Sequence, residues 1–283
     1  MSRRTRALLD LTATGVLWLC MAFAALTLGS ILLFLVSRGA GALSWEFISE
    51  PPRDGMTEGG ILTPIVGTVQ LILVSMGFAF PVSLATAVYL SEYAGSGRVT
   101  RVIRLAVRSL ASVPSVVLGL FGFAFFCAFL RFGACLLSAG LTLGCLALPT
   151  LVAASEAALR DVPQDYRDAS YALGATRWQT IRKVVLPAAF PGIITGLILS
   201  IGRVGGETAP IIFTGAVFFA PGFARSLFDS VMALPYHVYV LATAGTRIEK
   251  TVPMQYGAIL VLLALVLGIS MTGIVARARL RRK

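Results

Sequence analysis

Long apolar stretches alternate with shorter polar stretches along almost the whole chain. Each apolar stretch has close to the roughly 20 residues that a helix needs to cross the hydrocarbon core of a membrane. The predicted spans cover residues 14–37, 63–90, 111–131, 135–155, 188–214 and 254–275. This pattern predicts an all-α integral membrane protein with about six transmembrane helices, of which the third and fourth form a short hairpin.

Composition favours a membrane protein over the other structural classes. Hydrophobic residues make up 57% of the chain and charged residues only 13%, about half the share that is usual in soluble domains. No sustained alternation of apolar and polar residues is present, which excludes a transmembrane β-barrel. The first apolar stretch is too long for the core of a signal peptide, so it is predicted to be an uncleaved first span.

Lysine and arginine predict the orientation, because these residues gather in the cytoplasmic loops of membrane proteins. Seventeen of the 24 basic residues fall in the N-terminal segment, 91–110, 155–187 and 276–283, and six fall in the segments on the other side. Both termini are therefore predicted to be cytoplasmic. On this interpretation the net charge of +11 marks cytoplasmic loops and gives no reason to expect a nucleic acid partner.

One cytoplasmic segment, 96–110, carries arginines at spacings of three and four residues. Arg98, Arg101, Arg104 and Arg108 therefore share one face of a helix. The spacing predicts an interfacial helix whose arginines meet anionic lipid head groups. The alternative is a contact surface for a cytoplasmic partner. On the outer side, the stretch 215–250 is too long for a bare turn, and residues 223–234 are predicted to form a short surface helix.

The cytoplasmic segment 156–192 is long for a connection between two spans, which is typical of a functional loop. A proline precedes a first short helix, and Gly174 is placed to end that helix in the C′ position. Thr176 can then cap a second helix, which Leu186 and Pro187 stop before the next span. The segment therefore predicts two short helices joined by a glycine turn.

This spacing resembles the coupling loop of ABC importer permeases. The family pattern is Glu-Ala-Ala, three residues, Gly, nine residues, Ile, one residue and Leu-Pro. The matching positions here are Asp168, Ala169, Ser170, Gly174, Val184, Leu186 and Pro187. Asp for Glu, Ser for Ala and Val for Ile are mild departures. The resemblance implies that residues 168–174 form a docking helix that enters a groove on a separate ATPase subunit.

The stretch 196–215 places two charged residues in an apolar span. An arginine at the centre of a span, where Arg203 is predicted to lie, costs about 2.5–3.5 kcal/mol on insertion scales. Glu207 lies four residues on, so on a helix it shares a face with Arg203 and can pair with it. Two roles stay open: a structural ion pair, or a cation that lines an anion path, since the guanidinium binds phosphate in a bidentate manner.

Three further motifs indicate a more specific family within the ABC importer permeases. GGILTPIVGTVQL at 59–71 and AVYLSEYA at 87–94 are similar to the phosphate-specific ABC transporter permease family, and Gly-Glu-Thr-Ala-Pro at 206–210 is similar to its PstA-type subunits. The resemblance implies an ABC importer type I permease architecture in a bacterial inner membrane, with inorganic phosphate as cargo. The implied partners are a PstC-like second permease, two copies of a PstB-like ATPase subunit, a PstS-like extracytoplasmic phosphate-binding protein and membrane lipid.

The same resemblance implies functional residues and a domain organisation. Arg203, Glu207 and Thr208 would lie on the substrate path. The predicted organisation is an N-terminal tail, first span and outer loop in 1–58, a permease core in 59–275 with the coupling loop at 156–187, and a basic tail in 276–283.

Catalysis by this chain is not expected. Its three lysines do not follow a glycine, so the phosphate-binding loop of ATPases is excluded and ATP hydrolysis requires a partner chain. The single histidine, His237, has no second histidine with which to share a metal, and no cofactor site is predicted. The rival functions are a permease for molybdate or sulfate, an ion-gradient-driven secondary transporter and, least supported, a membrane-embedded enzyme.

Overall fold

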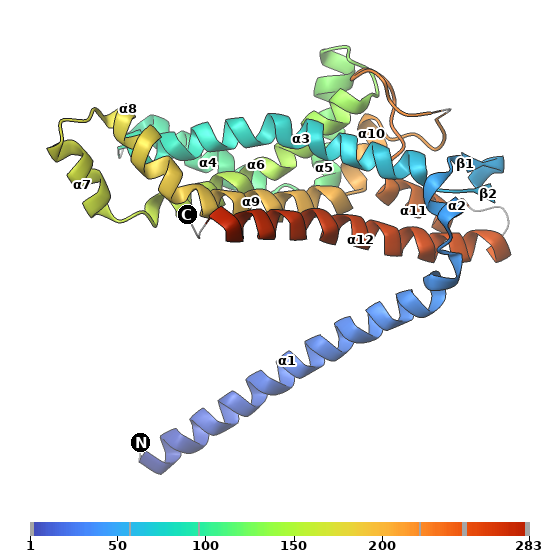
Figure 1. Cartoon of the computed structure of the whole chain (residues 1–283), viewed down its shortest axis with the longest axis horizontal. Coiled ribbons are helices and arrows are strands. Elements are labelled where there is room, and N and C mark those ends of the chain that lie inside the picture. Colours follow the sequence, from blue (N-terminus) through green and yellow to red (C-terminus); the bar gives the residue numbers. More distant parts are fainter. Residues whose placement is uncertain (1–2, 57, 96, 221, 245–247, 281–283) are drawn as a thin grey trace.

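The computed structural model describes residues 3–56, 58–95, 97–220, 222–244 and 248–280. One long helix, α1 (Arg3–Gly39), stands away from a bundle formed by the other helices (Figure 1). It meets the bundle near its C-terminal end, where it contacts α12 (Ile248–Leu280). The most apolar part of α1 buries none of its residues within this chain, so lipid or another chain must cover it.

The bundle is built from α3 (Leu62–Val88), α6 (Leu136–Arg160), α9 (Leu186–Gly206) and α12. Two glycines let α6 approach α3 closely: a Cβ atom at Gly140 would lie 2.4 Å from Val74 Cγ1, and one at Gly144 would lie 2.7 Å from Phe78 Cδ1. The main core between these helices includes Leu71, Met76, Leu143, Leu151, Val204 and Ile211.

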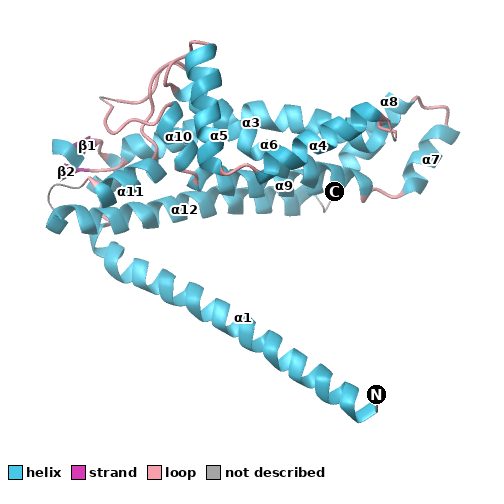
Figure 2. Cartoon of the chain, turned by 180° about the vertical axis from the view of Figure 1, so that it is seen from behind, coloured by secondary structure: helices cyan, strands magenta, loops and turns pink. Residues whose placement is uncertain are grey.

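Short elements cover the two ends of the bundle (Figures 1 and 2). One end holds α2 (Trp45–Ser49), the antiparallel strands β1 (Pro52–Arg53) and β2 (Glu58–Gly59), the 3₁₀ turns Ala40–Ala42 and Asp54–Met56, and α11 (Leu234–Thr243). The opposite end holds α7 (Gln164–Ala172) and α8 (Arg177–Thr180). Each end has an apolar cluster of its own, so the buried core runs the length of the bundle.

Five of the described helices are long and apolar enough to cross a membrane, and a bent pair raises the number to six. The prediction of about six spans is confirmed in this sense. The bent pair is α4 (Arg98–Ser112) followed, after a 109° bend, by α5 (Ser115–Gly122) and a π-helical turn, Phe123–Phe129. The third span begins later than predicted because Pro114 forces Val113 into an extended conformation (φ −72°, ψ 128°).

The predicted fifth span, 188–214, is wrong at both ends. The helix begins at Arg177 and runs through a π-helical turn, Ile181–Val185, into α9. Leu186-Pro187 therefore does not stop it, because Pro187 lies in the first turn of α9, directly after the wider π-helical turn. At the other end the helix stops at Gly206 and α10 (Ala209–Thr214) starts anew, with Pro210 in its first turn.

Two local effects explain the break between α9 and α10. Gly205 and Gly206 weaken the end of α9, because glycine loses more backbone entropy in a helix than other residues do. Pro210 has no N–H to donate to the carbonyl group of Gly206, so a continuous helix would lack that bond. Glu207 accordingly takes an extended conformation (φ −75°, ψ 130°) between the two helices.

The prediction of a helix over 223–234 is also wrong, because this part of the chain is a loop. The side chain of Asp229 accepts the backbone N–H groups of Arg225 and Ser226, both at 2.8 Å. Such local bonds compete with helical hydrogen bonding. The helix α11 begins only at Leu234.

Candidate functional site

The connection between α6 and α9 forms the two helices and the glycine turn that the sequence predicts. Gly174 follows α7 in the left-handed conformation (φ +80°), which a residue without a Cβ atom adopts at little cost. The N–H of Ala175 donates to the carbonyl of Ser170, and the N–H of Gly174 donates to that of Tyr171. This is the Schellman arrangement, and it satisfies carbonyl groups that the end of α7 would otherwise leave free.

The second helix, α8, begins at the predicted cap, Thr176. The N–H of Gln179 donates to Thr176 Oγ1, and the N–H of Thr176 donates to Gln179 Oε1 at 2.8 Å, which completes a capping box. The hydroxyl groups of Ser170 and Thr180 lie 2.9 Å apart and join α7 to α8. The two helices therefore form one unit, which we call the α7–α8 unit (Gln164–Thr180).

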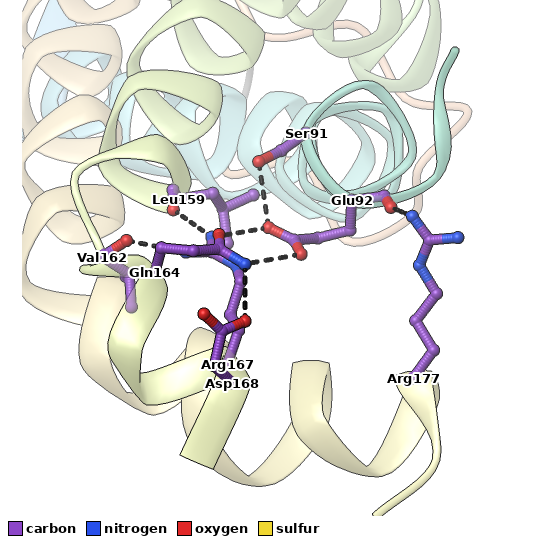
Figure 3. A network of polar contacts seen from close by, with 8 residues as sticks. All are labelled: Ser91, Glu92, Leu159, Val162, Gln164, Arg167, Asp168 and Arg177. Carbon is purple, nitrogen blue, oxygen red and sulfur yellow. Dashed lines mark hydrogen bonds and ion pairs between the residues drawn. The ribbon is translucent and has the colours of Figure 1, made fainter. Parts of the chain in front are cut away.

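A buried ion pair fixes this unit to the end of α3 (Figure 3). Arg167 lies on α7, and Glu92 lies in a π-helical turn, Tyr89–Tyr93, that continues α3; both residues are buried. Arg167 Nη2 lies 2.9 Å from Glu92 Oε1, and Arg167 Nε lies 3.3 Å from Glu92 Oε2. The guanidinium therefore meets both carboxylate oxygens, the geometry that makes such pairs strong. The hydroxyl of Ser91 donates to Glu92 Oε1 at 3.0 Å.

Arg167 also binds the end of α6. Its Nη1 donates to the carbonyl of Val162 at 2.7 Å, and its Nη2 donates to the carbonyl of Leu159 at 2.8 Å. A buried charge is costly unless it is paired and hydrogen-bonded, and both conditions are met here. One side chain thus links α3, α6 and α7.

A second arginine of the loop reaches the same turn of α3. Arg177, the first residue of α8, stacks over the ring of Tyr93 with its Cζ atom 4.9 Å from the ring centroid. Its Nη2 also donates to the backbone carbonyl of Glu92 (Figure 3). We call Glu92, Arg167 and Arg177 the clamp. The clamp holds both helices of the α7–α8 unit against a single turn at the end of α3.

The α7–α8 unit carries several exposed apolar and aromatic side chains. Leu173 is 89% exposed, and Tyr166, Tyr171 and Trp178 are also exposed. The predicted docking residues Asp168 and Ala169 are exposed on α7 as well. The unit lies at the extreme end of the bundle (Figures 1 and 2). Tyrosine, tryptophan and exposed aliphatic residues gathered in this way are typical of a protein–protein interface.

The predicted coupling residues fall into two groups. Asp168, Ala169, Ser170 and Gly174 lie on α7 or directly after it. Leu186 and Pro187 lie instead in the first turn of α9, where Leu186 packs against the apolar cluster below the α7–α8 unit and Pro187 is exposed. Only the first group belongs to the α7–α8 unit.

The predicted path residues lie at the break between α9 and α10. Arg203 Nε lies 3.7 Å from Glu207 Oε1, so the predicted ion pair is present. It forms between the last turn of α9 and the extended residue after it, and not along one continuous helix. The side chain of Arg203 is 48% exposed and that of Glu207 is 21% exposed, so the pair faces out of the single chain. Thr208 precedes α10 and is half-buried beside them.

One glycine beside this pair permits close packing within the chain. A Cβ atom at Gly205 would lie 3.0 Å from Val266 Cγ2 and 3.3 Å from Ile72 Cδ1, so this glycine brings α9 close to α12 and α3. A Cβ atom at Gly206 would meet no atom of the described chain within 4 Å. The face that carries Arg203 is therefore open at Gly206.

No role for the clamp residues follows from the sequence alone. Glu92 lies within the quoted motif AVYLSEYA, and Arg167 lies just before the docking positions, but 75 residues separate the two. The available signal is weak: Glu92 is an acid directly after an apolar span, and Arg167 is the one basic residue of α7. Neither feature identifies its partner without the fold.

Among the described residues, no group of three histidine, cysteine or acidic side chains is arranged to hold a metal ion. His237 lies on α11, outside the candidate spans, and is only 3% exposed. Neither of its ring nitrogens has a hydrogen-bond partner in the described part of the chain, and burial lowers the pKa of His237 to about 4. The histidine is therefore neutral at physiological pH and packs as a core residue.

The chain is similar in sequence to known membrane transport proteins. Residues 79–281 match the family model described as binding-protein-dependent transport system inner membrane component. The chain is 39% identical to the phosphate transport system permease protein PstA of Mycobacterium leprae, over 86% of this chain and 80% of that protein. It is 35% identical to the probable ABC transporter permease protein YqgI of Bacillus subtilis, over 75% of this chain and 72% of that protein.

A third relative, the phosphate transport system permease protein PstA 1 of Mycobacterium tuberculosis strain H37Rv, is 43% identical over 65% of this chain and 59% of its own length. Solved structures agree in fold. The MetNI methionine ABC transporter in an inward-facing conformation matches with a TM-score of 0.63 and 21% identity, covering 78% of this chain and 95% of that chain. A bacterial alginate ABC transporter matches with a TM-score of 0.64 and 15% identity, covering 90% and 92%.

Proposed function

Because this chain belongs to the family of binding-protein-dependent transport system inner membrane components, it is a multi-pass permease subunit of the ABC importer type I fold, and we propose that inorganic phosphate is its cargo. The names of its PstA relatives support this cargo. The exposed guanidinium of Arg203 supports an anion path, since arginine binds phosphate oxygens through paired N–H groups. The chain supplies the translocation path and leaves ATP hydrolysis to a partner.

The α7–α8 unit is the observation that carries an ATP-driven mechanism. Its coupling-loop spacing, its place at one end of the bundle and its exposed aromatic residues all suit a surface that docks into an ATPase subunit. Asp168, Ala169, Ser170 and Gly174 form the docking helix and its terminal turn, and Leu186 and Pro187 begin the span that follows. This assignment makes the α7–α8 end, and with it both chain termini, cytoplasmic.

Permeases of ABC importers work with ATPase subunits, a substrate-binding protein and a second permease. The proposed partners are accordingly a PstC-like permease, two PstB-like ATPase subunits and a PstS-like phosphate-binding protein. The second permease and lipid would cover the apolar surface of α1 that this chain leaves exposed. The second permease would also complete the substrate path beside Arg203, Glu207 and Thr208.

In the proposed mechanism the clamp transmits movement. When ATP draws the ATPase subunits together, α7 moves with the subunit into which it docks. Arg167 contacts α3 and α6 directly, so displacement of α7 is passed to two helices of the bundle core. The helices of the bundle then move as rigid bodies around the path, and the protein shifts from inward-open to outward-open states and back. Phosphate passes because the contacts along the path are few and weak enough to release it.

Reconstituted transport tests this function. The complex of this chain with its second permease and ATPase is placed in proteoliposomes with the binding protein outside, and uptake of radiolabelled phosphate is followed. We expect uptake that requires ATP and that excess sulfate or molybdate does not inhibit. Equal inhibition by molybdate or sulfate would assign the permease to another oxyanion. Uptake driven by an ion gradient without the ATPase would contradict the proposal.

A further inference from the structure

A polar cavity lies beside the clamp, between the end of α3, the start of α4 and the end of α6. Its volume is about 440 Å³. Arg101 and Arg104 of α4 and Arg160 of α6 line it, together with Ser91 and Thr100. Neither the docking surface nor the proposed translocation path uses this cavity.

The cavity has a surplus of positive charge. Among the described residues, Glu156 is the one acid that pairs with its arginines: Arg104 Nη2 lies 2.8 Å and Arg160 Nη2 lies 2.6 Å from Glu156 Oε1. Arg101 has no charged partner within the described part of the chain. Three guanidinium groups around one carboxylate leave a net charge of +2. The hydroxyl groups of Ser91 and Thr100 add hydrogen-bonding groups to the same wall.

The shared carboxylate also orders two of these arginines in advance. Arg104 binds both oxygens of Glu156 and directs Nη2 to the carbonyl of Leu90 at 3.5 Å. Arg104 is therefore fixed between α3 and α6, and its side chain still keeps 32% of its surface exposed. Ordered guanidinium groups bind tetrahedral anions better than mobile ones, because less side-chain entropy is lost on binding.

The outer side of α4 indicates where this cavity lies relative to a membrane. Val99, Val102 and Leu105 follow one another at three-residue spacing, and each is more than 60% exposed. A helix with an arginine face and an exposed apolar face is typical of the boundary between hydrocarbon and water. Basic pockets between membrane helices at this depth bind lipid head groups.

We propose that the cavity lined by Arg101, Arg104 and Arg160 is a binding site for a phosphate group, separate from the proposed translocation path. The apolar face of α4 beside the cavity favours an anionic phospholipid head group as the source of that phosphate. A free phosphate anion has the same chemistry and is the second source. A ligand here bridges α3, α4 and α6 next to the clamp, so its presence would stabilise the end of the bundle that carries the α7–α8 unit.

Binding to the full-length chain in detergent tests this site without any need for transport. Native mass spectrometry measures retention of phosphatidylglycerol, with phosphatidylcholine as the reference because its quaternary ammonium balances its phosphate charge, and equilibrium dialysis measures inorganic phosphate. The variants are Arg101→Gln and the double variant Arg101→Gln/Arg104→Gln. The matched control is Arg98→Gln/Arg108→Gln, which removes two exposed arginines from the same helix but none from the cavity.

We expect phosphatidylglycerol affinity to fall about fivefold for Arg101→Gln and about 25-fold for the double variant, since each arginine that contacts the head group inside the cavity contributes a factor of about five. The control is expected to lose about twofold, and phosphatidylcholine retention is expected to be unchanged. If the cavity variants lose inorganic phosphate binding but retain phosphatidylglycerol, the binding site exists and its ligand is the free phosphate anion. Equal losses in the cavity variants and the control, or no loss at all, would overturn the proposal.

Loss of Arg104 also removes an ion pair with Glu156, so folding is checked by circular dichroism. Arg101→Gln leaves the Arg104–Glu156–Arg160 contacts intact. If the double variant does not fold, the single variant decides the outcome. An inactive transporter would leave this binding result unchanged, so the two proposals fail independently.

Discussion

Two arginine–glutamate pairs in this chain differ in almost every physical respect. Arg167 and Glu92 are 75 residues apart in sequence, buried, and joined by two hydrogen bonds. Arg203 and Glu207 are four residues apart, partly exposed, and meet at 3.7 Å through one pair of atoms. The first pair binds three helices together, whereas the second borders a break between two helices.

This difference indicates that the two ion pairs have different roles. A buried, fully hydrogen-bonded pair stays in one geometry, because separating the two side chains leaves a buried charge without its partner. A partly exposed pair that lines a water-filled path contributes little to stability, since water screens it and the two side chains can separate at low cost. The first suits a rigid connection between the docking helix and the bundle. The second suits a path, where an arginine must exchange its carboxylate partner for a passing anion.

Breaking the first pair is expected to have the largest effect on stability. Arg167→Met leaves the Glu92 carboxylate buried without its cation, which costs about 3–5 kcal/mol in the free energy of unfolding. Thermal unfolding of the purified chain in detergent measures the loss. The matched control is Arg182→Met, because Arg182 is exposed on the helix after α8 and should change stability by less than about 0.5 kcal/mol.

The double variant Glu92→Met/Arg167→Met sharpens this test. Replacing both charges with apolar side chains removes the stranded carboxylate, so unfolding stability should recover well above that of Arg167→Met alone. Phosphate uptake should not recover, because methionine cannot donate to the carbonyl groups of Leu159 and Val162. If unfolding stability and phosphate uptake both recover, the clamp serves only to pack the helices and does not transmit movement.

The second pair is expected to show the opposite behaviour. Arg203→Gln should change unfolding stability by less than about 1 kcal/mol, as for other exposed pairs. ATP-dependent phosphate uptake should fall about tenfold or more, since a hydrogen bond to a charged group contributes about 1.5–3 kcal/mol. Arg108→Gln, which removes an exposed charge outside the coupling loop and the proposed path, serves as control for both readouts.

Exchanging the two charges separates the two roles of Arg203. In Arg203→Glu/Glu207→Arg the ion pair can re-form, but the residues that face the path are altered. If Arg203 contacts the anion, uptake stays low in this double variant. Uptake restored to the original level would make the pair structural and would contradict the assignment to the path.

A smaller effect is expected at the turn that shapes the α7–α8 unit. Gly174→Ala places a Cβ atom at a φ of +80°, which costs about 1–2 kcal/mol. Thermal unfolding should show this loss, while the matched change Gly77→Ala should be neutral or stabilising, because Gly77 lies inside α3 with open space around it. An equal loss at the two positions would show that the left-handed turn has no special cost.

Local patterns predicted the local features correctly. The glycine turn at Gly174, the cap at Thr176 and the pairing of Arg203 with Glu207 each depend on residues a few positions apart, and each is present. The extent of the apolar stretches also predicted the helical bundle, with a bend at Pro114 that shortens one span.

Predictions failed where two local signals competed or where distant segments meet. The sequence pattern predicts that Pro187 stops a helix, but the π-helical turn before it allows the helix to continue. The adjacent Gly205 and Gly206 end α9 where hydrophobicity alone predicted a longer span. The clamp was missed because no spacing rule connects Glu92 with Arg167. Their proximity is a consequence of the packing of α3 against α6, which exists only in the folded chain.

The central claim is that α7, held by the clamp, transmits the ATPase cycle to the bundle. The most direct test replaces Gln164–Ala172 with a glycine–serine linker of equal length and measures ATP-dependent phosphate uptake by the reconstituted complex. We predict that uptake falls to the level seen without ATP while the chain still inserts in the membrane and binds the second permease. Uptake at the original rate through the linker would contradict the account.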